Sequence, residues 1–169
     1  LNAHGDTVQD DLDEFLTHNI RYDAEKNILH GRNMFMLGCD DKAGMALILI
    51  AAKYSDCPLK ILFTVEEEIG CNGIKSVDPS FYDDVAFAIT LDRKGSGDII
   101  DTYGGRRMAP KAFVNALIEI GRKFGHELKP SHGSFADTFY ISNYCIAVNM
   151  SAGYYNAHTT RDYIDIGEA

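Results

Sequence analysis

Two stretches of sequence decide the fold class: LKILFTV at residues 59–65 and VAFAITL at residues 85–91. Each is a continuous apolar run of strand length, which is typical of strands covered on both faces. Helical patterns separate such runs, and AGMALILIAAKY at 43–54 is apolar nearly all round, so we expect it to be buried. Apolar strands that alternate with helices predict an α/β fold with three αβα layers around a mostly parallel, mixed sheet.

Weaker patterns predict the remaining elements. We expect the tail of a strand at 1–3, a hairpin within 21–36, short helices at 72–77 and 135–142, strands at 98–103 and 145–150, and a helix at 109–124. No internal repeat and no linker divides the chain, so residues 1–169 are expected to form a single domain that is trimmed at both ends.

Charge and hydropathy narrow the classes of partner and location. The chain has 169 residues and a formal net charge of −9. A phosphate backbone favours a basic surface, so we do not expect nucleic acid as a partner. The acidic residues either form a solvated surface or line a cleft that suits cations. No apolar run is long enough to span a membrane and no signal peptide precedes Leu1, so we expect no membrane contact. The cysteines, which show no disulfide pattern, predict a cytoplasmic protein.

The four cysteines are Cys39, Cys57, Cys71 and Cys145. They show neither C-x-x-C spacing nor the density of a disulfide framework, so they are interpreted as reduced thiols. Cys39 and Cys71 lie beside acidic motifs, where a thiolate could bind zinc. We favour the alternative that both are small packing residues.

Acidic and imidazole residues follow the predicted strands at the points where the strands end. His4 and Asp6 follow the first strand, Glu66 to Glu68 follow LKILFTV, Asp92 follows VAFAITL, and His158 lies beyond the last strand. In open α/β sheets, sites form at the carboxyl ends of the strands. So many like charges at one sheet edge would repel one another unless cations neutralised them. The sequence therefore predicts a metal site.

Several of these residues have a second interpretation. Asp40 or Asp41 could cap the following helix, although capping explains only one of the two. The alternative is that Asp40 bridges two metals while Asp41 orders the turn. Asp6 would accept the second ring N–H of His4 and so fix its tautomer. The Glu66 to Glu68 run is either a solvated loop or a ligand beside a general base.

Five motifs, in this order, closely resemble those of the co-catalytic zinc exopeptidases. They are AHGDTV at 3–8, LGCDDKAG at 37–44, TVEEEIGCNG at 64–73, LDRKG at 91–95 and NAHTT at 156–160. This clan contains aminopeptidases, carboxypeptidases and aminoacylases with a phosphorylase/hydrolase-like fold. The resemblance covers nearly the whole chain, and it implies that residues 1–169 form a catalytic domain.

The resemblance implies two divalent metal ions, most simply zinc, with cobalt or manganese as alternatives. His4 and Asp92 would hold one metal, and Glu68 and His158 the other. Asp40 would bridge the two, roughly 3.5–4 Å apart as in other two-metal sites.

The same resemblance implies the catalytic residues. Glu67 would be the general base, and Asp6 the partner of the ligand His4. Asp41 matches the residue that follows the bridging Asp, often across a cis peptide bond in this clan.

The substrate-binding residues are less well marked. Many relatives insert a second, dimerising domain between the last Asp ligand and the last His ligand. Here the stretch of sequence between Asp92 and His158 is short, so the chain resembles the compact, single-domain aminopeptidase-like branch. Arg93, Tyr154 or Tyr155 could replace a lid residue at the oxyanion. Asp137 either receives a substrate amine or is a cap residue.

These observations predict a hydrolase that cleaves amide bonds of short peptides or amino-acid amides, most specifically an aminopeptidase. An N-acyl amino acid deacylase is the nearest alternative. A two-metal phosphoesterase and a catalytically silent metal-binding module also remain open.

The four other histidines lack ligand spacing and are interpreted as surface residues: His18, His30, His126 and His132. Only His132 is a candidate neighbour of the site.

Overall fold

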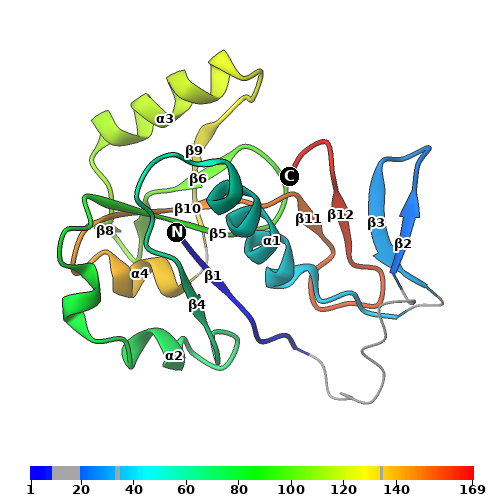
Figure 1. Ribbon diagram of the computed structural model, residues 1–169, viewed down its shortest axis with the longest axis horizontal. Helices are drawn as coiled ribbons and strands as arrows, with labels where there is room; N and C mark the ends of the chain where they lie inside the picture. The colour runs from blue at the N-terminus through cyan, green and yellow to red at the C-terminus, as the bar shows by residue number, and fades with distance from the viewer. Residues whose placement is uncertain (9–19, 33–34, 134) are drawn as a thin grey trace.

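The computed structural model describes residues 1–8, 20–32, 35–133 and 135–169. Its main sheet has six strands in the order β4-β1-β5-β10-β6-β9 (Figure 1). The strands are β1 (Asn2–His4), β4 (Leu62–Thr64), β5 (Phe87–Arg93), β6 (Asp98–Ile100), β9 (Lys129–Ser131) and β10 (Ile146–Ser151). Only the β6–β10 pair is antiparallel among these neighbours. The predicted mixed, mostly parallel sheet is therefore confirmed.

Helices cover both faces of this sheet. Successive strand residues point to opposite faces, and on β10 Ala147 packs with Ile141 of α4, whereas Val148 packs with Val114 of α3. The helices are α1 (Cys39–Tyr54), α2 (Asn72–Lys75), α3 (Lys111–Lys123) and α4 (Asp137–Ile141), with a 3₁₀ turn at Pro79–Tyr82. α1 and α3 lie on one face, and α2 and α4 on the other, which confirms the three αβα layers.

A second, antiparallel sheet stands at one end of the molecule, at the right of Figure 1. Its strands are β11 (Tyr154–Tyr155), β12 (Tyr163–Asp165), β3 (Ile28–Gly31) and β2 (Ile20–Asp23), in this order. The pair β2–β3 confirms the predicted hairpin. The sequence does not predict β11 and β12, because two or three residues are too few to show a period. A small hairpin of β7 (Thr102–Tyr103) and β8 (Arg106–Arg107) completes the fold.

Two expectations about burial are wrong. β4 is shorter than the predicted strand and lies at an edge of the described sheet, where Phe63 is 37% exposed and Val65 is 60% exposed. On α1, Leu49 and Ile50 are more than half exposed. An apolar sequence permits burial of a helix on all sides but does not require it. In the described structure, α1 packs through one side only, and apolar side chains on its other side are exposed. None of the helices in the described ranges combines the length and apolar character needed to cross a bilayer.

The start of α1 lies unusually close to the sheet. A Cβ atom added at Gly44 would lie 1.9 Å from the carbonyl oxygen of Leu91 in β5. Glycine therefore permits a contact between helix and strand that any side chain would block. The Asp40–Asp41 peptide bond is cis, and both residues have non-helical backbone angles within the first turn of α1. Asp40 lies beside the carboxyl end of β5, because His4 contacts both Asp40 and Asp92 of β5.

Candidate metal centre

Asp40 lies between two histidines that come from opposite ends of the chain. His4 Nε2 is 3.1 Å from Asp40 Oδ1 and 3.6 Å from Asp92 Oδ1. His158 Nε2 is 3.3 Å from Asp40 Oδ2 and 2.7 Å from Glu68 Oε1. The two oxygens of Asp40 therefore face two different pairs, each made of one imidazole and one carboxylate.

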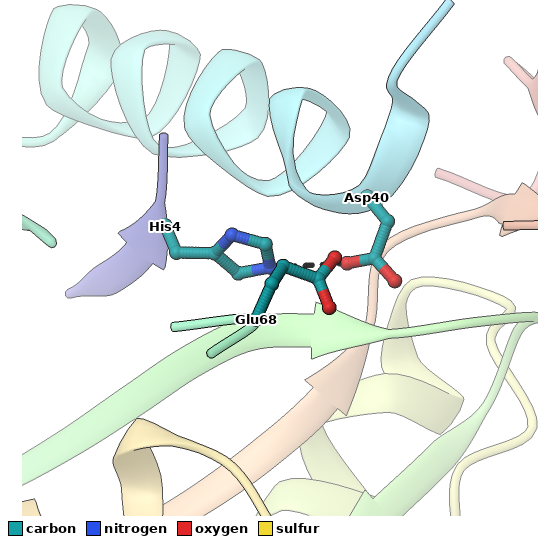
Figure 2. A group of neighbouring side chains, drawn as sticks. All are labelled: His4, Asp40 and Glu68. Atoms are coloured by element: carbon teal, nitrogen blue, oxygen red, sulfur yellow. Dashed lines mark hydrogen bonds and ion pairs between the residues drawn. The ribbon is translucent and has the colours of Figure 1, made fainter. Parts of the chain in front are cut away.

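Figure 2 shows how three of these side chains converge from separate elements. His4 ends β1, Asp40 lies in the first turn of α1, and Glu68 follows β4. Ligand atoms of His4, Asp40 and Glu68 lie within 4.8 Å of one another. Mixed imidazole and carboxylate donors of this kind suit zinc and related divalent cations. The five predicted ligands fit such a pair of ions, and their assignment as ligands stays a prediction.

A second group with this spacing contains Asp41 together with His4 and Asp92. Asp41 is fully buried, and its carboxylate already accepts hydrogen bonds from the backbone N–H groups of His4, at 3.2 Å, and Gly44, at 3.1 Å. Asp41 therefore holds β1 against α1. The sequence predicted only that Asp41 orders the turn.

The carboxylates around His4 favour positive charge at this site. Burial alone would lower the pKa of His4, but hydrogen bonds to Asp40 and Asp92 and the charges of nearby carboxylates raise it to about 12. Burial raises the pKa of Asp92, partly offset by His4. Burial opposes ionisation of Asp40 as well, yet the two histidines hold its pKa below the usual range. A proton on His4 thus occupies the position where a cation would be favoured.

Asp6 has a broader structural role than the sequence suggested. His4 Nδ1 lies 3.0 Å from the backbone carbonyl of Asp6 and 3.5 Å from its carboxylate, so the carbonyl is the nearer acceptor. The carboxylate accepts hydrogen bonds from the backbone N–H groups of Glu67, at 3.1 Å, and Glu68, at 3.2 Å. One residue therefore orients the His4 ring and the loop that carries both glutamates.

Glu67 has the properties of a general base. Burial, reinforced by the charge of Asp92, raises its pKa to about 7. A carboxylate with this pKa can both accept and return a proton near neutral pH. The Cys71 thiol donates a hydrogen bond to Glu67 Oε1 at 3.4 Å. Cys71 is thus a packing residue that also contacts the candidate base.

A cavity of about 1040 Å³ opens beside these residues. Asp40, Glu67, Glu68, Asp92 and His158 line one part of it. Its remaining lining includes Arg93, Lys94, Lys129, Tyr155 and Phe135. Four of the five predicted metal ligands, all except His4, thus line one cavity together with the predicted base and a group of cationic side chains.

Among the candidate substrate-binding residues, Arg93, Tyr154 and Tyr155 line this cavity. Arg93 donates hydrogen bonds to Asp98 at 3.1 and 3.2 Å, which fixes its guanidinium group. Tyr155 stacks on Tyr163, with 5.1 Å between ring centroids, and its hydroxyl group donates to Glu168. Arg93 and Tyr155 are therefore held in place at the wall of the cavity.

Asp137, the remaining candidate, is not among the residues that line the cavity. It is 1% exposed, and its carboxyl group accepts hydrogen bonds from Thr64 Oγ1 and, at 3.4 Å, from Asn2 Nδ2. Burial raises its pKa. This position does not support the expected contact with a substrate amine. Sequence cannot show whether an Asp at a helix start points inward or outward, and here it points into the core.

Two further residues, Asn149 and Asp162, support the site although neither lies in any of the five motifs. Asn149 Oδ1 accepts from the backbone N–H of Asp92 at 3.0 Å, and Asn149 Nδ2 donates to the Asp92 carbonyl at 2.9 Å. A lone Asn inside the apolar run of β10 is a signal that could have identified it, because buried polar groups need partners. The other is Asp162, which lies in a polar loop and gives no such signal.

None of the other described histidines belongs to a candidate group of metal ligands. His18 lies outside the described residues. His30 is partly buried in β3, and His126 and His132 are exposed. His132 lines a separate cavity with Asp101 and Lys111. It is therefore not a lining residue of the larger cavity.

Comparison with known proteins identifies the family. The model of Peptidase family M20/M25/M40 matches residues 1–167. The chain belongs to this family. It is thus a peptidase of the co-catalytic metal type, as its motifs predicted. No curated protein matches its sequence closely enough to report.

Solved structures share the fold of this peptidase at low sequence identity. Aminopeptidase PepT from Bacillus cereus is 16% identical with a TM-score of 0.72, and a tripeptidase from Staphylococcus aureus is 15% identical with a TM-score of 0.74. Both alignments cover 99% of this chain and 75% of the other. The dodecameric PhTET1-12s is 17% identical with a TM-score of 0.60, and there the match covers 83% of this chain but 47% of the other.

Proposed function

We propose that this peptidase hydrolyses amide bonds of short peptides, and acts most specifically as an aminopeptidase, with two divalent cations and Glu67 as general base. The observation that carries the proposal is the geometry of Asp40, whose two oxygens face separate imidazole–carboxylate pairs beside a cavity that Glu67 also lines.

His4 and Asp92 would hold one cation, Glu68 and His158 the other, and Asp40 would contact both. When bound, the cations supply Lewis acidity, which polarises a carbonyl group and makes bound water acidic near neutral pH. Zinc suits these donors, and cobalt or manganese would also be accepted.

Glu67 would act as the general base and then as the general acid. Its carboxylate would accept a proton from the attacking water and deliver it to the leaving amine. The hydrogen bonds from the Glu67 and Glu68 backbone to Asp6 support this role, because they fix the loop from which both side chains project.

The proposed substrate is a short peptide or an amino-acid amide. The preference for a free amino terminus rests on the similar structures of an aminopeptidase and a tripeptidase. Arg93, Lys94 and Lys129 line the cavity and would suit the terminal carboxylate of a short peptide. An N-acyl amino acid deacylase is the second candidate, since the same cationic wall would suit the carboxylate of an acylated amino acid.

Hydrolysis of a dipeptide and of its N-acetylated form, under saturating zinc, tests the proposal. We expect faster cleavage of the free dipeptide. The Glu67→Gln variant, purified in parallel, is the control for contaminating peptidases. Equal or faster cleavage of the acetylated form would replace the aminopeptidase by the deacylase, and no cleavage of either would contradict both.

A further inference from the structure

Asp162 joins two loops that are far apart in sequence. It is 2% exposed, and its carboxylate accepts hydrogen bonds from the backbone N–H groups of Leu37, at 2.8 Å, and Cys39, at 3.0 Å. Each carboxylate oxygen accepts from one N–H group, so Asp162 holds the backbone immediately before Asp40 in place. Burial lowers the pKa of the Lys42 amine, and the charge of Asp162 acts against this effect.

Each of the two loops that Asp162 joins carries a candidate ligand. Asp40 follows Cys39 directly, and His158 precedes Asp162 in the turn between β11 and β12. The contact between these ligands, Asp40 Oδ2 to His158 Nε2, is 3.3 Å. The position of His158 relative to Asp40 therefore depends on how the two loops are joined.

The other ligand pair has separate supports. His4 belongs to β1, where Asp41 accepts a hydrogen bond from its backbone N–H. Asp92 belongs to β5, and Asn149 of β10 bonds its backbone N–H and carbonyl. The main sheet therefore holds this pair without help from Asp162.

His158 has less protection. Its side chain is 44% exposed, whereas that of His4 is 1% exposed. His158 also has a positive φ of 62° outside any strand. Its backbone position therefore relies more on loop contacts than that of His4.

We propose that Asp162 is a positioning residue for the cation held by Glu68 and His158. It aligns the Asp40 loop with the His158 loop before metal binds. This inference rests on the proposed two-metal function.

The variant Asp162→Asn tests it with little change in shape. Its amide oxygen can accept from one backbone N–H, but its NH₂ group opposes the other, because both are donors. We expect the first zinc equivalent to bind as in wild type and the second to bind about 10-fold or more weakly, a usual penalty for losing a group that orients a ligand. Zinc titration calorimetry and elemental analysis after gel filtration measure both equivalents.

Asp165→Asn is the matched control. Asp165 lies in β12 and accepts a hydrogen bond from the backbone N–H of Gly167, at 2.9 Å, rather than from the Asp40 loop. We expect two tight equivalents in this variant. Thermal unfolding of both metal-free variants shows whether a general loss of stability accounts for weaker binding.

Amide hydrogen exchange of the metal-free wild type gives a second measurement that needs no variant. We expect protected N–H groups at Leu37 and Cys39 before zinc is added. Rapid exchange there, two unweakened equivalents in Asp162→Asn, or equal weakening of both would overturn the inference. A wild type that binds no zinc would instead overturn the proposed two-metal function.

Discussion

Glu67 and Glu68 are neighbours in sequence with different contacts. Glu68 Oε1 lies 2.7 Å from His158, whereas Glu67 Oε1 accepts a hydrogen bond from Cys71. Glu67→Gln should lower kcat by about 100-fold or more, the size of a general-base contribution, and retain both metals. Glu68→Gln should lose one metal equivalent as well as activity.

Parallel kinetics and elemental analysis of the two variants test this prediction. The matched change at adjacent positions controls for the loss of one negative charge. If Glu67→Gln lost metal while Glu68→Gln kept it, the two roles would have to be exchanged.

The contact between α1 and β5 depends on Gly44. In Gly44→Ala the new methyl group would meet the Leu91 carbonyl at 1.9 Å, so helix or strand must move. We expect a loss of about 1–3 kcal/mol in the free energy of unfolding, as for other overpacked sites. Because β5 carries Asp92 and α1 carries Asp40, zinc uptake should fall as well.

Chemical denaturation measures this loss. Ala52→Ser, at an exposed position of the same helix, is the control and should change stability by less than about 0.5 kcal/mol. A Gly44→Ala variant as stable as wild type would show that α1 does not depend on this close approach.

Individual elements differ in how well sequence predicts them. The helix expected at 109–124 corresponds to α3. It could be predicted because its apolar stripe extends over several turns. The strand expected at 85–91 overlaps β5. The strands β11 and β12 are too short for a pattern, so the small sheet could not be predicted. The candidate ligands were chosen from motifs, and the structure brings their side chains together. The contacts of Asp162 and Asn149 depend on tertiary structure that no local pattern encodes.

The whole molecule should respond to pH through its buried charges. In the metal-free protein, folding raises the pKa of Glu67 from 4.5 to about 7, so the stability from its bound proton is lost as pH rises through that interval. The raised pKa of His4, from 6.5 to about 12, acts in the same direction above pH 6.5. The lowered pKa of Asp40 acts in the opposite direction, but below pH 3.8.

We therefore expect the Tm of the metal-free protein to fall between pH 5 and 8. Saturating zinc should reduce this dependence, since the cation replaces the protons that hold the acidic groups together. Thermal unfolding in a chelator and in zinc, at matched ionic strength, makes the comparison. A metal-free Tm that rose over this interval would contradict the assigned pKa directions.

Three carboxylates, those of Asp6, Asp41 and Asp162, hold the site through backbone N–H groups. A main-chain N–H is common to every amino acid except proline, so these bonds do not discriminate among the other side chains. A mutational library could therefore vary the residues whose backbone N–H groups make these hydrogen bonds without losing the bonds. Packing and the candidate ligands set the limits on such changes. Proline is the one residue that would remove the bonds outright.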